Sequence, residues 1–155
     1  MTEIMETRRS FKRFALCLLL APVLANMPLI LLGGAGGMIL TALETLLPEA
    51  GQILAGAKAA AIVLAFVSGF AVFFGGGQYL LFGGVVLWFL LAQLPLRLWI
   101  CALALFVVNA LVAGLIFAEG DQQFAKLCLF YGSFFAPLWG AAFAWLYKRD
   151  PQDAA

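Results

Sequence analysis

The sequence predicts an all-α integral membrane protein: four membrane-spanning helices in a bundle, with one further short helix that is broken or re-entrant. Hydrophobic residues make up 65% of the 155 residues and charged residues 11%, with a net charge of +1. In a soluble domain, hydrophobic residues make up about 45–50% of the sequence and charged residues about 25%. The charges are clustered and leave apolar segments of the ~20 residues that a helix needs to cross a hydrocarbon core. This composition excludes a soluble enzyme, a disordered chain and a nucleic-acid partner.

The chain is expected to begin with a basic segment, residues 1–13, that stays in the cytoplasm. Residues 1–25 also have the layout of a secretory signal, with a cleavage site after Ala25. The apolar run continues to residue 32, however, which is longer than the apolar region of about 7–15 residues in a signal peptide. We therefore predict an uncleaved anchor, and three spans is the alternative if cleavage occurs.

The first span is predicted at residues 14–32. Asn26 lies in it between two prolines, and we expect its side chain to hydrogen-bond a backbone group that they free. The glycine-rich segment 33–37 is expected to end this helix. Residues 38–47 are apolar with one acid and too short to span, which favours an interfacial helix on the outer face.

The run from residue 59 to residue 96 holds no charge and, if fully helical, would extend for about 57 Å, nearly twice the thickness of the hydrocarbon core. Three consecutive glycines begin at Gly75, and glycine disfavours helix. We expect a break there, with a span at 53–74 and a short segment at 79–94 that crosses fully or is re-entrant. The remaining spans are predicted at 98–118 and 127–147, followed by a cytoplasmic tail at 148–155.

The positive-inside rule distinguishes four spans from five. With four spans, seven cations lie on one side of the membrane: Arg8, Arg9, Lys12, Arg13, Arg97, Lys148 and Arg149. With five, Arg97, Lys148 and Arg149 move to the other side and the bias nearly vanishes. We therefore predict four spans, five being the alternative, in a multi-pass protein of the bacterial inner membrane with both termini in the cytoplasm.

Small residues recur at every fourth position in the last two spans. In the last span they are Cys128, Gly132, Ala136, Gly140 and Ala144, and in the preceding span Ala110, Gly114 and Ala118. Such ridges let helix backbones approach closely in lipid. We expect them to form a helix-packing interface, within this hairpin or between copies. Aromatic residues, among them Trp139 and Phe143, are expected away from the small residues of the last span.

Residues suited to catalysis are scarce. The chain has no histidine, and its three cysteines are scattered, which argues against imidazole-held haem, zinc sites and His-dependent triads. We therefore expect no catalytic residues, no metal and no cofactor. The candidates for a polar or solute site are Lys58, Gln78 and Asn109. Lys58 is expected to pair with Glu44 or Glu49 near the membrane surface, whereas Asn109 lies in the middle of its span.

These observations favour a non-enzymatic protein that acts through helix–helix contacts within the bilayer. Its partner would be another membrane protein or a second copy of this chain, and its role that of a subunit, an assembly factor or an immunity-type protective protein. The alternative is a small oligomeric channel or transporter for a small solute, which the break at 75–78 and the polar residues in the spans favour.

Overall fold

The computed structural model describes residues 11–94 and 96–148, without the side chain of Phe74. These residues are almost entirely helical and contain no strand, and five of their helical segments are long and apolar enough to cross a membrane. The predicted all-α membrane fold is confirmed. Most of the basic segment 1–13 and of the tail 148–155 lies outside the described residues.

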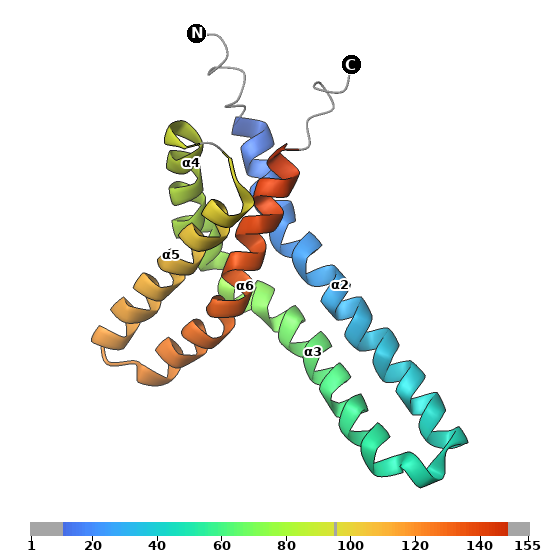
Figure 1. The fold of residues 1–155 in the computed structure, drawn as a ribbon. Helices are drawn as coiled ribbons and strands as arrows, with labels where there is room; N and C mark the ends of the chain where they lie inside the picture. The colour runs from blue at the N-terminus through green and yellow to red at the C-terminus, as the bar shows by residue number, and fades with distance from the viewer. Residues whose placement is uncertain (1–10, 95, 149–155) are drawn as a thin grey trace, which may run out of the picture.

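The first two helices form a long antiparallel arm. Helix α2 (Phe11–Leu46) has 36 residues and is about 54 Å long. A short 3-10 turn, η1 (Pro48–Ala50), leads into α3 (Gly51–Gln78), which returns along α2. Figure 1 shows this pair extending away from the other helices.

The expectation that the glycines at 33–37 end the first helix was wrong, because α2 runs through them. Residues 38–46 are its last turns and do not form a separate interfacial helix. Gly33 lies against α3: a Cβ built on it would be 2.5 Å from the carbonyl oxygen of Ala61 and 2.7 Å from the nitrogen of Ala65. The glycines therefore allow close helix packing, and the backbone keeps the internal hydrogen bonds that hydrocarbon requires.

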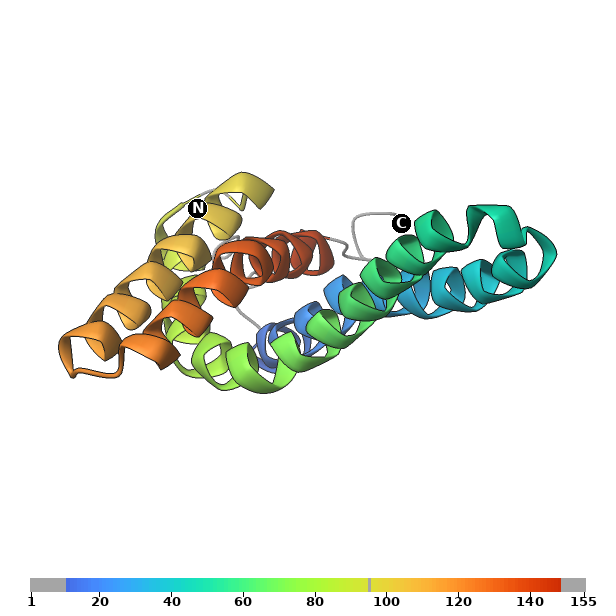
Figure 2. The same ribbon diagram turned by 90° about the horizontal axis from the view of Figure 1, so that it is seen from below.

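The expected break at 75–78 is also absent. Helix α3 continues through these residues into a π-helical segment, η2 (Tyr79–Gly83), and then α4 (Gly84–Gln93). A Cβ on Gly75 would lie 2.9 Å from the indole ring of Trp139, so this glycine makes room for a buried side chain of another helix. Packing thus outweighs the low helix propensity of glycine. The helical path turns away from the α2–α3 arm near η2 (Figures 1 and 2).

Helices α5 (Leu98–Ala118) and α6 (Gln122–Lys148) form a second, shorter arm. Gly120, with φ of 102°, forms the turn between them. Helix α6 begins five residues before the predicted span at 127–147. The carboxylate Oδ1 of Asp121 accepts a hydrogen bond of 3.0 Å from the backbone N–H of Phe124, as a helix N-cap does.

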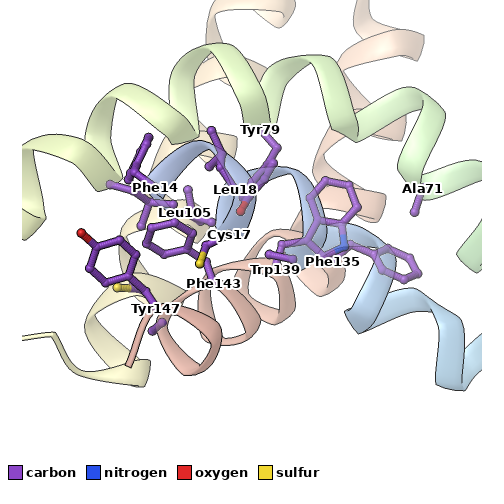
Figure 3. Packing of buried hydrophobic residues seen from close by; sticks show 14 residues of the cluster. Phe14, Cys17, Leu18, Ala71, Tyr79, Leu105, Phe135, Trp139, Phe143 and Tyr147 are labelled. Atoms are coloured by element: carbon purple, nitrogen blue, oxygen red, sulfur yellow. The ribbon is translucent and has the colours of Figure 1, made fainter. Parts of the chain in front are cut away.

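The two arms meet where α2 begins and α6 ends (Figure 1). The ring of Phe14 lies 4.9 Å from that of Trp88 in α4 and 5.4 Å from that of Phe143 in α6. The Arg13 guanidinium donates to the carbonyl of Tyr147 and lies 4.8 Å from the centre of its ring. Figure 3 shows the buried side chains that α2, α5, α6 and the turn near η2 bring together here. From this core the two arms diverge.

Candidate functional site

A buried hydrogen-bonded junction joins three helices that are distant in sequence. The amide nitrogen of Asn26 in α2 donates to the carbonyl oxygen of Ser68 in α3 at 3.0 Å. The indole nitrogen of Trp139 in α6 donates to Oδ1 of Asn26 at 3.1 Å. All three residues are almost completely buried. The expectation that Asn26 bonds its own helix is therefore wrong, because its amide connects α2 to α3 and α6.

Beside this junction lies a cleft of about 280 Å³ between α3, η2, α5 and α6. Its volume is close to the lower end of the range for small-molecule sites, about 300 Å³. The residues lining it are Phe66, Phe70, Ala71, Gly75, Gln78, Tyr79, Gly83, Leu105, Val108, Asn109, Val112, Phe124, Leu127, Cys128, Tyr131, Gly132, Phe135, Ala136 and Trp139. Every one of these residues is uncharged. The cleft therefore suits a neutral and largely apolar occupant.

Two of the three residues proposed for a polar or solute site, Gln78 and Asn109, line this one cleft. The side-chain nitrogen of Gln78 donates to Sγ of Cys128 at 3.3 Å. Asn109 is only 9% exposed, and its Nδ2 finds no hydrogen-bond partner among residues 11–94 and 96–148. The cleft thus contains a buried N–H donor without an acceptor, which is costly in an apolar environment.

Lys58 lies far from the cleft, near the tip of the α2–α3 arm. Its ammonium pairs with the carboxylate of Glu44, and both side chains are about one-third exposed. This is one of the two pairings predicted from the sequence, and it is confirmed. A cation neutralised near a helix end is typical of a residue anchored at the membrane surface.

The small residues of α6 face the rest of the protein. A Cβ on Gly132 would lie 1.9 Å from Oδ1 of Asn109, and one on Gly140 would lie 2.4 Å from the carbonyl oxygen of Cys101. Ala136 lines the cleft, and Ala144 belongs to the buried core. Both glycines therefore lie at a close contact between α5 and α6.

The small residues of α5 lie on its other side. Ala110, Gly114 and Ala118 are exposed, and apart from the adjacent backbone of α5 itself no atom of the described chain lies within 4 Å of a Cβ built on Gly114. The face of α5 that is buried instead carries Cys101, Leu105, Asn109 and Ala113. The residues proposed as one packing interface are therefore divided between an internal contact and an uncovered face.

Sequence reasoning missed several residues that build the site. Trp139 and Phe143 were expected away from the small residues of the last span, yet they are 2% and 0% exposed and belong to the same buried side of α6, whereas Phe130 is 71% exposed. Gly33 and Gly37 are four residues apart, and this small-xxx-small spacing is a signal that points to the α2–α3 contact. No comparable signal identifies Trp139, because its burial depends on the glycine opposite it in α3.

The residues of the cleft and the junction carry amide, indole, phenol and thiol groups, which bind through neutral hydrogen bonds. In the part of the chain that the structure describes, no group of three or more His, Cys, Asp or Glu is placed to hold a metal ion. Comparisons with protein-family models, curated proteins and solved structures found no match to this chain.

Proposed function

We propose that this protein is a non-enzymatic, multi-pass component of the bacterial inner membrane that acts by binding a helix of another membrane protein. Its role would be that of a subunit, an assembly factor or a protective, immunity-type partner. The observation that carries the proposal is the uncovered small-residue face of α5, formed by Ala110, Gly114 and Ala118. Without a hydrophobic drive between helices in lipid, surfaces of this kind supply close van der Waals packing.

The large side chains around this face give it the shape of a shallow groove. Phe106 is 40% exposed, Leu111 64% and Phe117 52%. They project from the same half of α5, whereas Gly114 has open space above it. A helix from a partner can therefore approach the α5 backbone at Gly114 and contact these larger side chains on either side.

Substitution of Gly114 by leucine tests the proposal without disturbing the internal packing. Gly114→Leu fills the groove, and because no other part of the described chain lies within 4 Å of a Cβ at that position, the protein should keep its fold. It should also gain a little helix propensity. We expect at least a tenfold loss of the co-purifying membrane protein when the tagged chain is isolated from native membranes in a mild detergent.

The matched control is Gly77→Leu, which adds the same bulk at another exposed and open helical position. It should leave the complex intact. A second copy of this chain as the lost partner would assign the groove to self-association. If Gly114→Leu and Ala110→Leu both retain the complete complex, the proposal is wrong.

We also propose that the chain crosses the membrane four times with both termini in the cytoplasm. The start of α2, the end of α4 and the end of α6 lie towards one end of the structure, and the turn between α2 and α3 and the turn between α5 and α6 lie at the tips of the arms (Figure 1). This arrangement supports the four-span model, in which α3, η2 and α4 together cross the membrane once. Topology reporters fused after Arg97 and Ala155 should report the cytoplasm, and one after Asp121 the outside. An external signal at Ala155 would favour five spans.

A small channel or transporter is the second candidate, because Gln78 and Asn109 line the same cleft. Purified protein in liposomes tests it by flux of small neutral solutes. Flux that is lost in Asn109→Leu while folding is retained would favour this function over the first. An ion-coupled carrier is disfavoured by the position of Lys58, which is paired with Glu44 near a helix end.

A further inference from the structure

We infer that the cleft between η2, α5 and α6 binds an uncharged, apolar compound that carries a carbonyl oxygen and is dissolved in the core of the bilayer. The cleft lies on the opposite side of α5 from the groove at Gly114. This inference is therefore independent of the proposed partner contact.

The hydrogen-bond donor for such a compound is Nδ2 of Asn109. This nitrogen is buried and has no partner within the described chain, and the whole side-chain amide lies against Gly132, which also lines the cleft. A buried N–H group has a higher free energy without an acceptor than with one, and in hydrocarbon no water is present to act as the acceptor. A carbonyl oxygen entering the cleft removes this cost.

The rest of the cleft selects against charge. Its walls include the rings of Phe70 and Phe135 and the side chain of Leu105, and none of its lining residues is charged. An ionised headgroup placed there would lose its hydration without gaining a counter-ion. An apolar chain or ring, in contrast, gains from burial against these side chains.

Depth distinguishes a dissolved compound from a phospholipid. Asn109 lies about 16 Å from the start of α5 and about 14 Å from its end, which is near the middle of a hydrocarbon core of about 30 Å. The ester groups of a phospholipid are held near its charged headgroup at the membrane surface. A compound without a headgroup reaches this depth freely, and exposed Phe66 and Leu127 at the edge of the cleft provide entry from the lipid side.

Photo-crosslinking in lipid nanodiscs tests the inference. The probe is the methyl ester of a fatty acid that carries a diazirine in its chain, and the comparison probe is the diazirine-bearing alkane of equal length. We expect the ester to label peptides containing Cys128 and Tyr131 about fivefold more than the alkane, as one net hydrogen bond predicts. A phosphatidylcholine with the same diazirine chain should label these peptides no more than the alkane does.

Three variants make the test specific. Asn109→Ala should reduce labelling by the ester to the level of the alkane and leave labelling by the alkane unchanged. Val112→Phe fills the cleft and should abolish labelling by both, whereas Val107→Phe, at an exposed position of α5, should change neither. Gly114→Leu should keep full labelling even where it loses the partner, which separates this inference from the proposed function.

The inference is overturned by equal labelling with ester and alkane, or by ester labelling that survives Asn109→Ala. If the phosphatidylcholine probe labels these peptides as strongly as the methyl ester does, the cleft is assigned to bilayer phospholipid instead. Absence of labelling by every probe in the unmodified protein would likewise overturn the inference.

Discussion

The side-chain amide of Asn109 in α5 lies directly against Gly132 in α6, so that a Cβ on Gly132 would be 1.9 Å from its Oδ1 and 2.2 Å from its Nδ2. No side chain larger than hydrogen fits there while the amide keeps its place. A polar side chain in the middle of a span is thus accommodated by a glycine on the neighbouring helix. This pair also forms one wall of the cleft.

Gly132→Ala is expected to lower the free energy of unfolding by about 1–3 kcal/mol, because the added methyl group displaces a buried amide. The cost should be much smaller in an Asn109→Ala background, where the methyl group finds space. Thermal denaturation in detergent measures both values. Gly77→Ala is the control, since among the described residues no side chain, and no backbone beyond the adjacent turns of the helix, lies within 4 Å of that position. An equal cost in the two backgrounds would contradict the contact.

Gly140→Leu is expected to disrupt folding more severely than Gly132→Ala. A side chain on Gly140 meets the backbone carbonyl of Cys101, which cannot move aside as a side chain can. The yield of folded protein in detergent and its melting temperature provide the measurement. Phe130→Leu, on an exposed face of the same helix, should have little effect. Unchanged yield and melting temperature for Gly140→Leu would mean that α5 and α6 do not pack at this point.

Trp139→Phe tests the junction of three helices. It keeps an aromatic ring in the core but removes the N–H that Oδ1 of Asn26 accepts, leaving a buried acceptor unpaired. We expect a loss of roughly 1–2 kcal/mol in unfolding free energy. In an Asn26→Leu background the same change should cost distinctly less. Trp99→Phe, at a residue that is 60% exposed, is the control and should be neutral.

Lys58→Gln is expected to reduce stability by no more than about 1 kcal/mol, because the pair with Glu44 is partly exposed to solvent. Raising the salt concentration should screen the ion pair and lower the stability of the unmodified protein to nearly that of the variant. Exchanging the two residues, Glu44→Lys with Lys58→Glu, should restore most of the loss. A loss of several kcal/mol, unaffected by salt, would mean that this pair lies deep in hydrocarbon.

The sequence was sufficient to predict the helical class and the bounds of α5, because charges mark where apolar segments end. It was misleading at two glycines. The low helix propensity of glycine predicted that the first helix would end at Gly33 and that the next helix would break at Gly75. Propensity describes an isolated helix in water. These glycines instead lie where Ala61 and Trp139 approach from a neighbouring helix, and only the assembled fold reveals that approach.

The candidate site was predicted in part. Gln78 and Asn109 could be selected as polar residues within apolar segments, yet their placement in a single cleft depends on where the helical path turns at η2. The division of the small residues of α5 and α6 between an inner and an outer face was also beyond sequence reasoning. Both helices are apolar on every side, so hydrophobic periodicity does not distinguish lipid from protein.

The bonds of Asn26 also set an order of events during synthesis. Its two partners lie 42 and 113 residues further along the chain. At the usual pace of translation, about 5–20 residues per second, Ser68 follows within roughly 2–8 s and Trp139 only after roughly 6–23 s. During that interval Oδ1 of Asn26, in the newly inserted α2, lacks the donor that Trp139 of α6 later supplies. Completion of the chain is thereby coupled to closure of its core, and a ribosome that stalls before α6 leaves a nascent protein with an exposed polar group in the lipid.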